Sequence, residues 1–311
     1  MSHTVLTALS LGAGVQSTTI ALLAVEGVLP KPDVAIFADT GWEPKAVYQH
    51  LGRLSAVLTS AGIDVYLVSK GNLRADMLNP GSRYASVPYF VRNPDGSDGM
   101  GRRQCTSEYK LGPINRKVCE LLGAKAPDYR RVPKGRVCEQ WIGFSTDEIG
   151  RVSDRDHVSY IRKVYPLLDL EMSRKDCIRW LGVRGWQTTK SACIGCPYHG
   201  NRQWRDLRDN HPDEWDDAVD FDIRIRKGAQ GGTGGQLNGH AFLHRSRVPL
   251  SIAPIDRVTA AEWHERQGNL LDSLADSAAG YDPDEDGDPD GCSPYGCRSG
   301  TPITTPTEAH A

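Results

Sequence analysis

The first 70 residues alternate short apolar runs with longer stretches of helical periodicity, and this alternation restricts the fold more than any other feature of the sequence. In chain order, the apolar runs and helical stretches lie at 5–11, 17–27, 34–38, 44–61 and 65–68. Because two parallel strands need a crossover of a dozen or more residues, usually a helix, this spacing favours βαβ units. We therefore predict an α/β fold: a doubly wound, mostly parallel sheet with right-handed crossovers and helices on both faces.

The rest of the chain predicts further elements at less even spacing. In order, we expect a long loop at 79–103, a helix at 107–122, a strand at 137–144, a short helix at 174–181, two helices within 201–227, a glycine-rich loop at 228–235 and a last helix at 260–274. Ser173 suits the N-cap of the short helix, which would end at Gly182, and Pro212 would start the second helix of the pair.

Composition divides the chain into three parts. We predict an α/β domain at 1–170 and a helical, cysteine-bearing part at 171–279. Residues 280–311 contain seven acidic residues and one arginine among many prolines and glycines. Such a segment buries too little apolar area to offset its chain entropy, so we expect a disordered acidic tail.

Several classes of protein are disfavoured by composition. The chain has 311 residues, 39% of them hydrophobic, which is enough for a sizeable core. No apolar run approaches the roughly 18 residues that span a bilayer, and the N-terminus lacks the basic start of a signal peptide. We therefore expect a cytoplasmic protein with no membrane partner. In that setting the eight cysteines predict metal binding or catalysis in preference to disulfides.

A glycine-containing loop at 10–19 joins the first predicted strand to the first predicted helix. This is the carboxyl edge of the sheet, where open α/β folds bind ligands. Gly12 and Gly14 let backbone amides approach a ligand closely, the helix start adds N–H groups, and Ser10, Ser17 and Thr18 supply hydroxyl donors. The loop therefore predicts a phosphate or pyrophosphate site, and a tight turn with a Ser/Thr cap is the simpler alternative.

Two familiar phosphate-binding patterns fit this loop poorly. A Walker-type loop needs Gly-Lys-Ser/Thr, which is absent, and a dinucleotide fingerprint needs a third glycine where Ser17 stands. Asp39, 25 residues after Gly14 at the end of the second strand, could serve as a ribose acid. Dinucleotide binding therefore stays open as a competing hypothesis.

The loop is followed by further motifs in a fixed order. They are Ser10-Leu-Gly-Ala-Gly-Val-Gln-Ser17, Phe37-Ala-Asp-Thr-Gly41, Cys105-Thr-Ser-Glu-Tyr-Lys110, Gly143-Phe-Ser-Thr-Asp-Glu148 with Arg151, Tyr165-Pro-Leu167, and Lys190-Ser-Ala-Cys-Ile-Gly-Cys-Pro197. Together they resemble the PP-loop ATP pyrophosphatase superfamily (adenine nucleotide alpha-hydrolase-like), and the wider pattern is similar to its phosphoadenosine phosphosulfate (PAPS) reductase branch. The resemblance covers about residues 5–250.

The resemblance implies an activity and a nucleotide site. It implies an enzyme that uses ATP and Mg²⁺, cleaves ATP between the α and β phosphates and adenylates an acceptor, coupled to iron–sulfur-dependent sulfur transfer. The nucleotide-binding residues would be Ser10, Gly12, Gly14, Gln16, Ser17, Thr18, Asp39, Thr40 and Gly41. The acceptor could be a nucleic acid, and a sulfur donor protein could be a partner.

Two departures from the family pattern keep alternatives open. Gln16 replaces the usual acid before the loop serine, which leaves room for a non-catalytic nucleotide-sensing or nucleic-acid-binding protein. PAPS reductases carry a Glu-Cys-Gly-(Ile/Leu)-His motif near the C-terminus, whereas this tail has Gly291-Cys292-Ser-Pro-Tyr-Gly-Cys297. A sulfonucleotide reductase is therefore an alternative and not the main hypothesis.

Four cysteines are candidate metal ligands. Cys193 and Cys196 have a spacing that lets both thiolates reach one metal. Cys105 starts a helix in a basic loop, where positive potential lowers a thiol pKa, and Cys177 lies on the short helix before the pair. Together they would complete a [4Fe–4S] site or a Zn²⁺ site, and the resemblance implies iron–sulfur. Alternatively, Cys177 is a small buried apolar residue and the Cys193/Cys196 pair a redox dithiol.

Three charged residues are candidate catalytic groups. Arg151 could bind phosphate oxygens bidentately, and Glu148 could orient a metal, a ribose or that arginine. Lys110, about one turn after Cys105, could reach a phosphate or the cluster sulfurs. The simpler alternatives are a surface ion pair for Glu148 and Arg151 and a solvated helix face for Lys110.

Residues 102–136 carry ten Lys/Arg and three Asp/Glu, a charge that suits a polyanion. A nucleic acid would be held mainly through its phosphates, although nucleotide phosphates alone could account for the charge. His240 and His244 have a spacing compatible with metal ligation. No glutamate follows the first histidine, so we expect each to be a hydrogen-bonded structural histidine.

Overall fold

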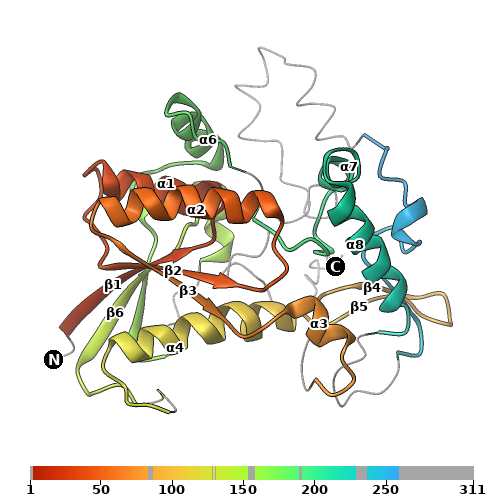
Figure 1. The fold of residues 1–311 in the computed structure, drawn as a ribbon, viewed down its shortest axis with the longest axis horizontal. Coiled ribbons are helices and arrows are strands. Elements are labelled where there is room, and N and C mark those ends of the chain that lie inside the picture. The colour runs from red at the N-terminus through yellow and green to blue at the C-terminus, as the bar shows by residue number, and fades with distance from the viewer. Residues whose placement is uncertain are drawn as a thin grey trace, which may run out of the picture.

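The computed structural model describes residues 3–82, 87–127, 129, 131–152, 158–188, 191–228 and 237–258. Its main element is a five-stranded sheet in the order β3-β2-β1-β6-β7, in which every neighbouring pair is parallel (Figure 1). The strands are β1 His3–Leu11, β2 Val34–Asp39, β3 Asp64–Ser69, β6 Arg136–Trp141 and β7 Ile161–Val164. The predicted α/β class with a mostly parallel sheet is confirmed.

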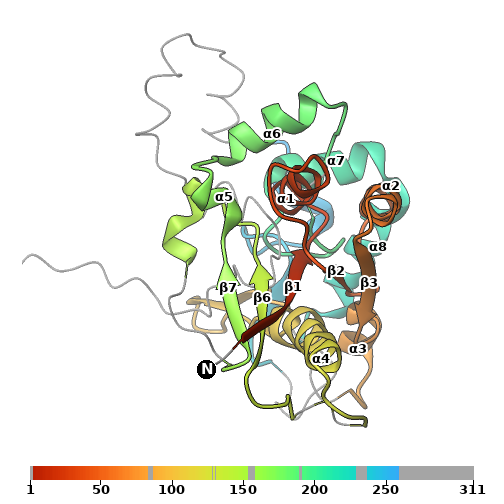
Figure 2. The same cartoon turned by 90° about the vertical axis from the view of Figure 1, so that its left-hand side faces the viewer.

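Helices cover both faces of this sheet (Figures 1 and 2). One face carries α1 Val15–Val25, α2 Lys45–Ser60 and α6 Arg174–Val183, and the other carries α4 Gly112–Leu121. Successive side chains of a strand point to opposite faces. Accordingly, Leu9 and Leu11 of β1 belong to the core beneath α1, whereas Leu6 and Ala8 belong to the core beneath α4.

Helix α6 shares the core of the α/β sheet, although the sequence places it beyond the predicted boundary at residue 170. Its Cys177 and Leu181 lie in the same apolar cluster as the buried side of α1. Ser173 caps the helix by a capping box with Asp176, as predicted. The helix ends one residue beyond Gly182, at Val183.

A second core lies beside the sheet. It packs α7 Asn201–Asn210 and α8 Pro212–Arg224 against α3 Leu73–Leu78 and a small antiparallel sheet in the order β5-β4-β8, with strands β4 Phe90–Arg92, β5 Asp98–Met100 and β8 His240–Phe242. The predicted division of the two helices at Pro212 is confirmed. The prediction of a loop throughout 79–103 is wrong, because β4 and β5 form a hairpin that is completed by the distant β8.

Four smaller elements lie outside the two sheets and the longer helices of the described residues. A π-helical turn at Thr106–Leu111 precedes α4. The predicted helix at 107–122 is therefore π-helical in its first part and α-helical in its second. Short helices at Thr146–Arg151 and α5 Pro166–Asp169 flank β7, and a single 3₁₀ turn forms at Leu250–Ile252. The predictions for 229–235, 260–274 and the acidic tail lie outside the described residues. Among the helices described, none is long and apolar enough to cross a membrane.

Candidate functional site

The glycine loop lies between the central strand and the first helix, as predicted. Helix α1 begins at Val15, and its N-cap residue is Gly14, which offers no side chain to the helix N–H groups. Ala13 has a φ of +55°, a left-handed conformation that is uncommon outside glycine. The Ser17 hydroxyl accepts a hydrogen bond from the backbone N–H of Gly12 at 3.2 Å. Ser17, one of the predicted binding residues, therefore links the start of α1 back to the beginning of the loop.

Two distant segments press against this loop. The Ser191 hydroxyl donates to the carbonyl of Gly12, and a Cβ on Gly14 would lie 3.4 Å from the Cβ of Ser191. From the β6 side, a Cβ on Gly143 would lie only 3.0 Å from the backbone nitrogen of Ser17. Glycine at 143 thus permits the close approach of its segment to the start of α1, whereas a Cβ at Gly14 would make an ordinary van der Waals contact.

Gln16 connects the loop to the predicted catalytic pair. Its side chain is 3% exposed. Its Nε2 donates to Glu148 Oε2 at 3.1 Å, and its Oε1 accepts from Arg174 Nη1 at 3.0 Å. Glu148 also forms an ion pair with Arg151. The structure therefore brings Gln16, Glu148 and Arg151 together, and it adds Arg174, which no motif in the sequence singles out.

Two of the predicted hydroxyls have partners inside the protein. Ser10 accepts a hydrogen bond from Gln140 Nε2 at 2.9 Å. Thr18 is fully buried, and its Oγ1 lies 2.9 Å from Nε2 of His50 on α2. Burial lowers the pKa of His50, which favours the neutral ring. Thr18 therefore joins α1 to α2, and Ser10 joins β1 to β6.

The predicted residues at the end of β2 form a tight turn. Asp39 Oδ1 accepts from the backbone N–H of Gly41 at 2.8 Å and from the Tyr48 hydroxyl at 2.7 Å. Gly41 has a φ of +68°, and a Cβ there would lie 3.0 Å from Asn72 Cα. Burial and the Asp39 carboxylate raise the pKa of Tyr48. Asp39 is thus held at the carboxyl edge of the sheet, one strand away from the glycine loop.

A buried polar cluster, formed by Thr40, Glu43, Lys110 and Cys193, lies beyond this turn. Thr40 Oγ1 donates to Glu43 Oε1 at 2.9 Å and lies 3.2 Å from Cys193 Sγ. Glu43 Oε1 is 3.5 Å from Cys193 Sγ and 4.0 Å from Lys110 Nζ. Lys110 is therefore not on a solvated helix face, because it is 5% exposed and paired with a buried carboxylate. Glu43 was not among the predicted site residues, although it follows the same strand end, four residues after Asp39.

The four candidate cysteines fall into different surroundings. Cys105 and Cys193 belong to the second core, and Cys196 contacts a small cluster with Ala192. Cys177 lies in the core between α1 and α6, where burial raises its thiol pKa to about 11. Within the described residues, no group of three or more His, Cys, Asp or Glu side chains could hold a metal ion. The [4Fe–4S] or Zn²⁺ centre stays a prediction.

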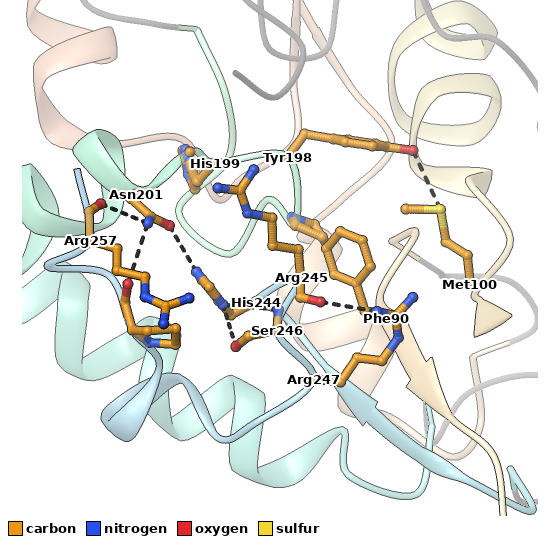
Figure 3. A pocket seen from close by; sticks show the side chains of 13 residues that line it. Phe90, Met100, Tyr198, His199, Asn201, His244, Arg245, Ser246, Arg247 and Arg257 are labelled. Carbon is orange, nitrogen blue, oxygen red and sulfur yellow. Dashed lines mark hydrogen bonds between the residues drawn. The ribbon is translucent and has the colours of Figure 1, made fainter. Parts of the chain in front are cut away.

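One segment, 191–201, connects these features. It starts at the glycine loop with Ser191, and its Cys193 reaches the buried polar cluster. Gly195 packs so closely on Trp42 that a Cβ there would lie 2.1 Å from the indole ring. His199 Nε2 then lies 3.0 Å from the carbonyl of Cys193, and the last residues of the segment line a cavity of about 600 Å³ (Figure 3).

No protein-family model matches this chain, and no curated protein matches its sequence.

Proposed function

We propose that this protein is a PP-loop nucleotide-binding enzyme of the PAPS reductase-like branch, which cleaves ATP between the α and β phosphates to adenylate an acceptor. One observation carries most of the proposal. The glycine loop at the carboxyl edge of the central strand is joined, through Gln16, to the buried Glu148 and its ion-pair partner Arg151. A pyrophosphate-binding loop next to a fixed guanidinium is the arrangement that α–β cleavage needs.

The loop supplies the binding contacts. The N-terminus of α1 carries a partial positive charge, and Gly14 offers no side chain that would compete for its N–H groups. The β and γ phosphates of ATP would lie over Gly12–Gly14, with the Ser17 hydroxyl at the same end of the helix. The turn at Asp39 would face the ribose, since it follows the neighbouring strand.

The reaction is a substitution at the α-phosphorus. An oxygen of the acceptor forms a bond to this phosphorus, the bond to the α–β bridging oxygen breaks, and pyrophosphate leaves with the bonding electron pair. Arg151 would stabilise the charge that develops on the leaving group, and Glu148 orients Arg151 by its ion pair.

Magnesium would supply further charge neutralisation when bound. The part of the chain that the structure describes offers no set of three Asp, Glu, His or Cys groups for an ion. A magnesium ion at a phosphate site is usually held by the phosphate oxygens, water and one or two carboxylates, and so needs no larger group of protein ligands. Cys177 lies in a different apolar core from Cys105 and Cys193, and the four-thiolate centre stays a prediction. No step of the proposed reaction is therefore assigned to an iron–sulfur cluster.

The proposal is tested with α-labelled ATP and Mg²⁺, incubated with the full chain and with RNA, DNA or small hydroxyl and carboxylate acceptors. We expect release of pyrophosphate together with either AMP or a labelled acceptor. An Arg151→Met variant should still bind ATP in calorimetry but should form none of these products. Absence of ATP binding by the unaltered protein would contradict the proposal.

A non-catalytic nucleotide-binding protein is the second candidate. It is favoured by the neutral Gln16, whose amide is already engaged by Glu148 on one side and Arg174 on the other. ATP binding without release of pyrophosphate or AMP under any acceptor would support this second candidate over the enzyme.

A further inference from the structure

A cavity of about 600 Å³ lies between the segment that follows Cys196 and the small antiparallel sheet (Figure 3). Its walls come from four places in the chain: the residues after Cys196, the strands β4 and β5, the turn after β8, and the segment that ends at Arg257. Nothing in the proposed ATP reaction uses this space.

The cavity is positively charged. Its thirteen lining residues include Arg245, Arg247 and Arg257 and no carboxylate. Arg247 is fixed in place, since its Nε donates to the carbonyl of Val91 at 3.1 Å and forms an ion pair with Asp98 Oδ1 at 3.0 Å. Arg257 is exposed at the other side of the opening. Guanidinium groups on opposite sides of a cavity suit an anion such as phosphate.

The same cavity presents flat rings. Phe90, Tyr198 and His199 line it, together with Pro197. Arg247 lies over the ring of Phe90 at 5.6 Å, and Arg103 lies over the ring of Tyr198 at 4.5 Å. Aromatic rings next to arginines offer stacking surfaces for a nucleobase.

One wall of the cavity is held by a buried hydrogen-bond network. His244 Nε2 lies 3.0 Å from Asn201 Oδ1, and His244 Nδ1 accepts from the backbone N–H of Ser246 at 3.1 Å. Asn201 in turn donates through Nδ2 to the carbonyls of Pro254 and Arg257. This network ties the turn after β8 to the start of α7 and to the last described segment, so the arginines are carried on a preformed frame.

We propose that this cavity is a second nucleotide-binding site, which takes the phosphate of a nucleotide unit on its arginines and the base on its rings. The unit can belong to a free nucleotide or to a single-stranded nucleic acid, since both present the same phosphate and base. The site is separate from the glycine loop and does not depend on ATP cleavage.

The test measures two ligands by fluorescence anisotropy and calorimetry: a labelled oligonucleotide of about 12 nucleotides, within the usual site size for single strands, and a free mononucleotide monophosphate. The variants are the double charge reversal Arg245→Glu with Arg257→Glu, and Tyr198→Leu for the stacking surface. The matched control is the double charge reversal Lys31→Glu with Arg179→Glu, at two exposed residues outside both the cavity lining and the basic stretch 102–136.

We expect the double charge reversal in the cavity to weaken oligonucleotide binding by about tenfold or more and to reduce its salt dependence, with little change in the control variant. Mononucleotide binding that is lost in the same variants identifies a free nucleotide as ligand, and binding of the oligonucleotide alone identifies a strand. Equal weakening in the cavity variants and in the control variant would overturn the proposal, as would binding of neither ligand. ATP affinity, measured in parallel, stays unchanged in the cavity variants, so failure here is distinct from failure at the glycine loop.

Discussion

Gln16 and Glu148 form a buried hydrogen bond of 3.1 Å, which links the first residues of α1 to the short helix after β6. Both side chains are nearly inaccessible to solvent. A neutral amide suits this position because Glu148 can stay ionised and paired with Arg151. The pattern that the sequence resembles has an acid at position 16. Here Gln16 fits its neighbours instead, because its amide donates to Glu148 and accepts from Arg174.

Replacing Gln16 by glutamate tests this match. In Gln16→Glu a second carboxylate would lie next to Glu148, so we expect the pKa of the pair to rise and the free energy of unfolding at pH 7 to fall by about 1–3 kcal/mol. Because carboxyls with a raised pKa in the folded state stabilise it only while protonated, the loss should be smaller at pH 5 than at pH 7. Urea unfolding at pH 5 and pH 7 measures this loss of unfolding free energy. A loss that is the same at both pH values would contradict repulsion between the two carboxylates as its cause.

The parts of the site that the sequence predicted are those set by local spacing. The glycine loop follows directly from an apolar strand and precedes a helical stretch, and Glu148 and Arg151 are three residues apart on one short element. By contrast, Arg174 meets Gln16 across 158 residues. Such a contact depends on how α6 packs on α1, which no local pattern specifies.

The strands β4 and β5 and the residue Cys177 also depend on contacts between distant parts of the chain, which local sequence patterns do not specify. The hairpin of β4 and β5 has strands of three residues, and β4 gains its second partner from β8, far along the chain. A run that short carries no measurable period. Likewise, Cys177 sits on a correctly predicted helix, yet the face that α6 turns toward α1 decides whether its thiol meets the core or other cysteines.

The close approach at Gly143 gives a second prediction. In Gly143→Ala the new methyl group would lie 3.0 Å from the nitrogen of Ser17, so the loop must move. We expect a loss of about 1–3 kcal/mol in unfolding free energy and weaker ATP binding in calorimetry. Gly182→Ala on α6 is the matched control, since its methyl meets nothing within 4 Å and should stabilise the helix by about 0.5–1 kcal/mol. Unchanged ATP binding and stability in Gly143→Ala would show that the loop tolerates the shift.

The ion pair of Lys110 and Glu43 lies inside the protein, with side chains 6% and 1% exposed. Lys110→Met leaves the carboxylate without this cation, and we expect a loss of about 3–5 kcal/mol. The double variant Glu43→Gln with Lys110→Met should lose less than Lys110→Met alone, because it no longer buries a single charge. Chemical unfolding of the four proteins in this cycle gives the coupling energy, and additive losses would mean that the pair does not interact.

Cys177 offers a direct test of the predicted metal centre. Its position among apolar residues of α1 and α6, with a thiol pKa raised by burial, leads us to expect that Cys177→Ala keeps the metal content of the anaerobically purified protein. Iron and zinc analysis with an absorption spectrum provides the readout. Cys193→Ala serves as the comparison, since Cys193 has the partner Cys196 at cluster-forming spacing. Loss of metal in Cys177→Ala would instead support a four-thiolate centre.

The predicted structural role of His244 is confirmed by its two hydrogen-bond partners, and it leads to a pH dependence. Burial, with a smaller contribution from the neighbouring Arg245 guanidinium, lowers the pKa of His244 from 6.5 to about 4. A depressed histidine pKa means that the unfolded chain binds a proton first as pH falls, so stability is lost between pH 6.5 and 4. From pH 7 to pH 5 this contribution amounts to about 2 kcal/mol. His244→Gln keeps a donor and an acceptor at the site without titrating, and urea unfolding should show a shallower decline than in the unaltered protein; equal slopes would mean that His244 does not titrate with unfolding.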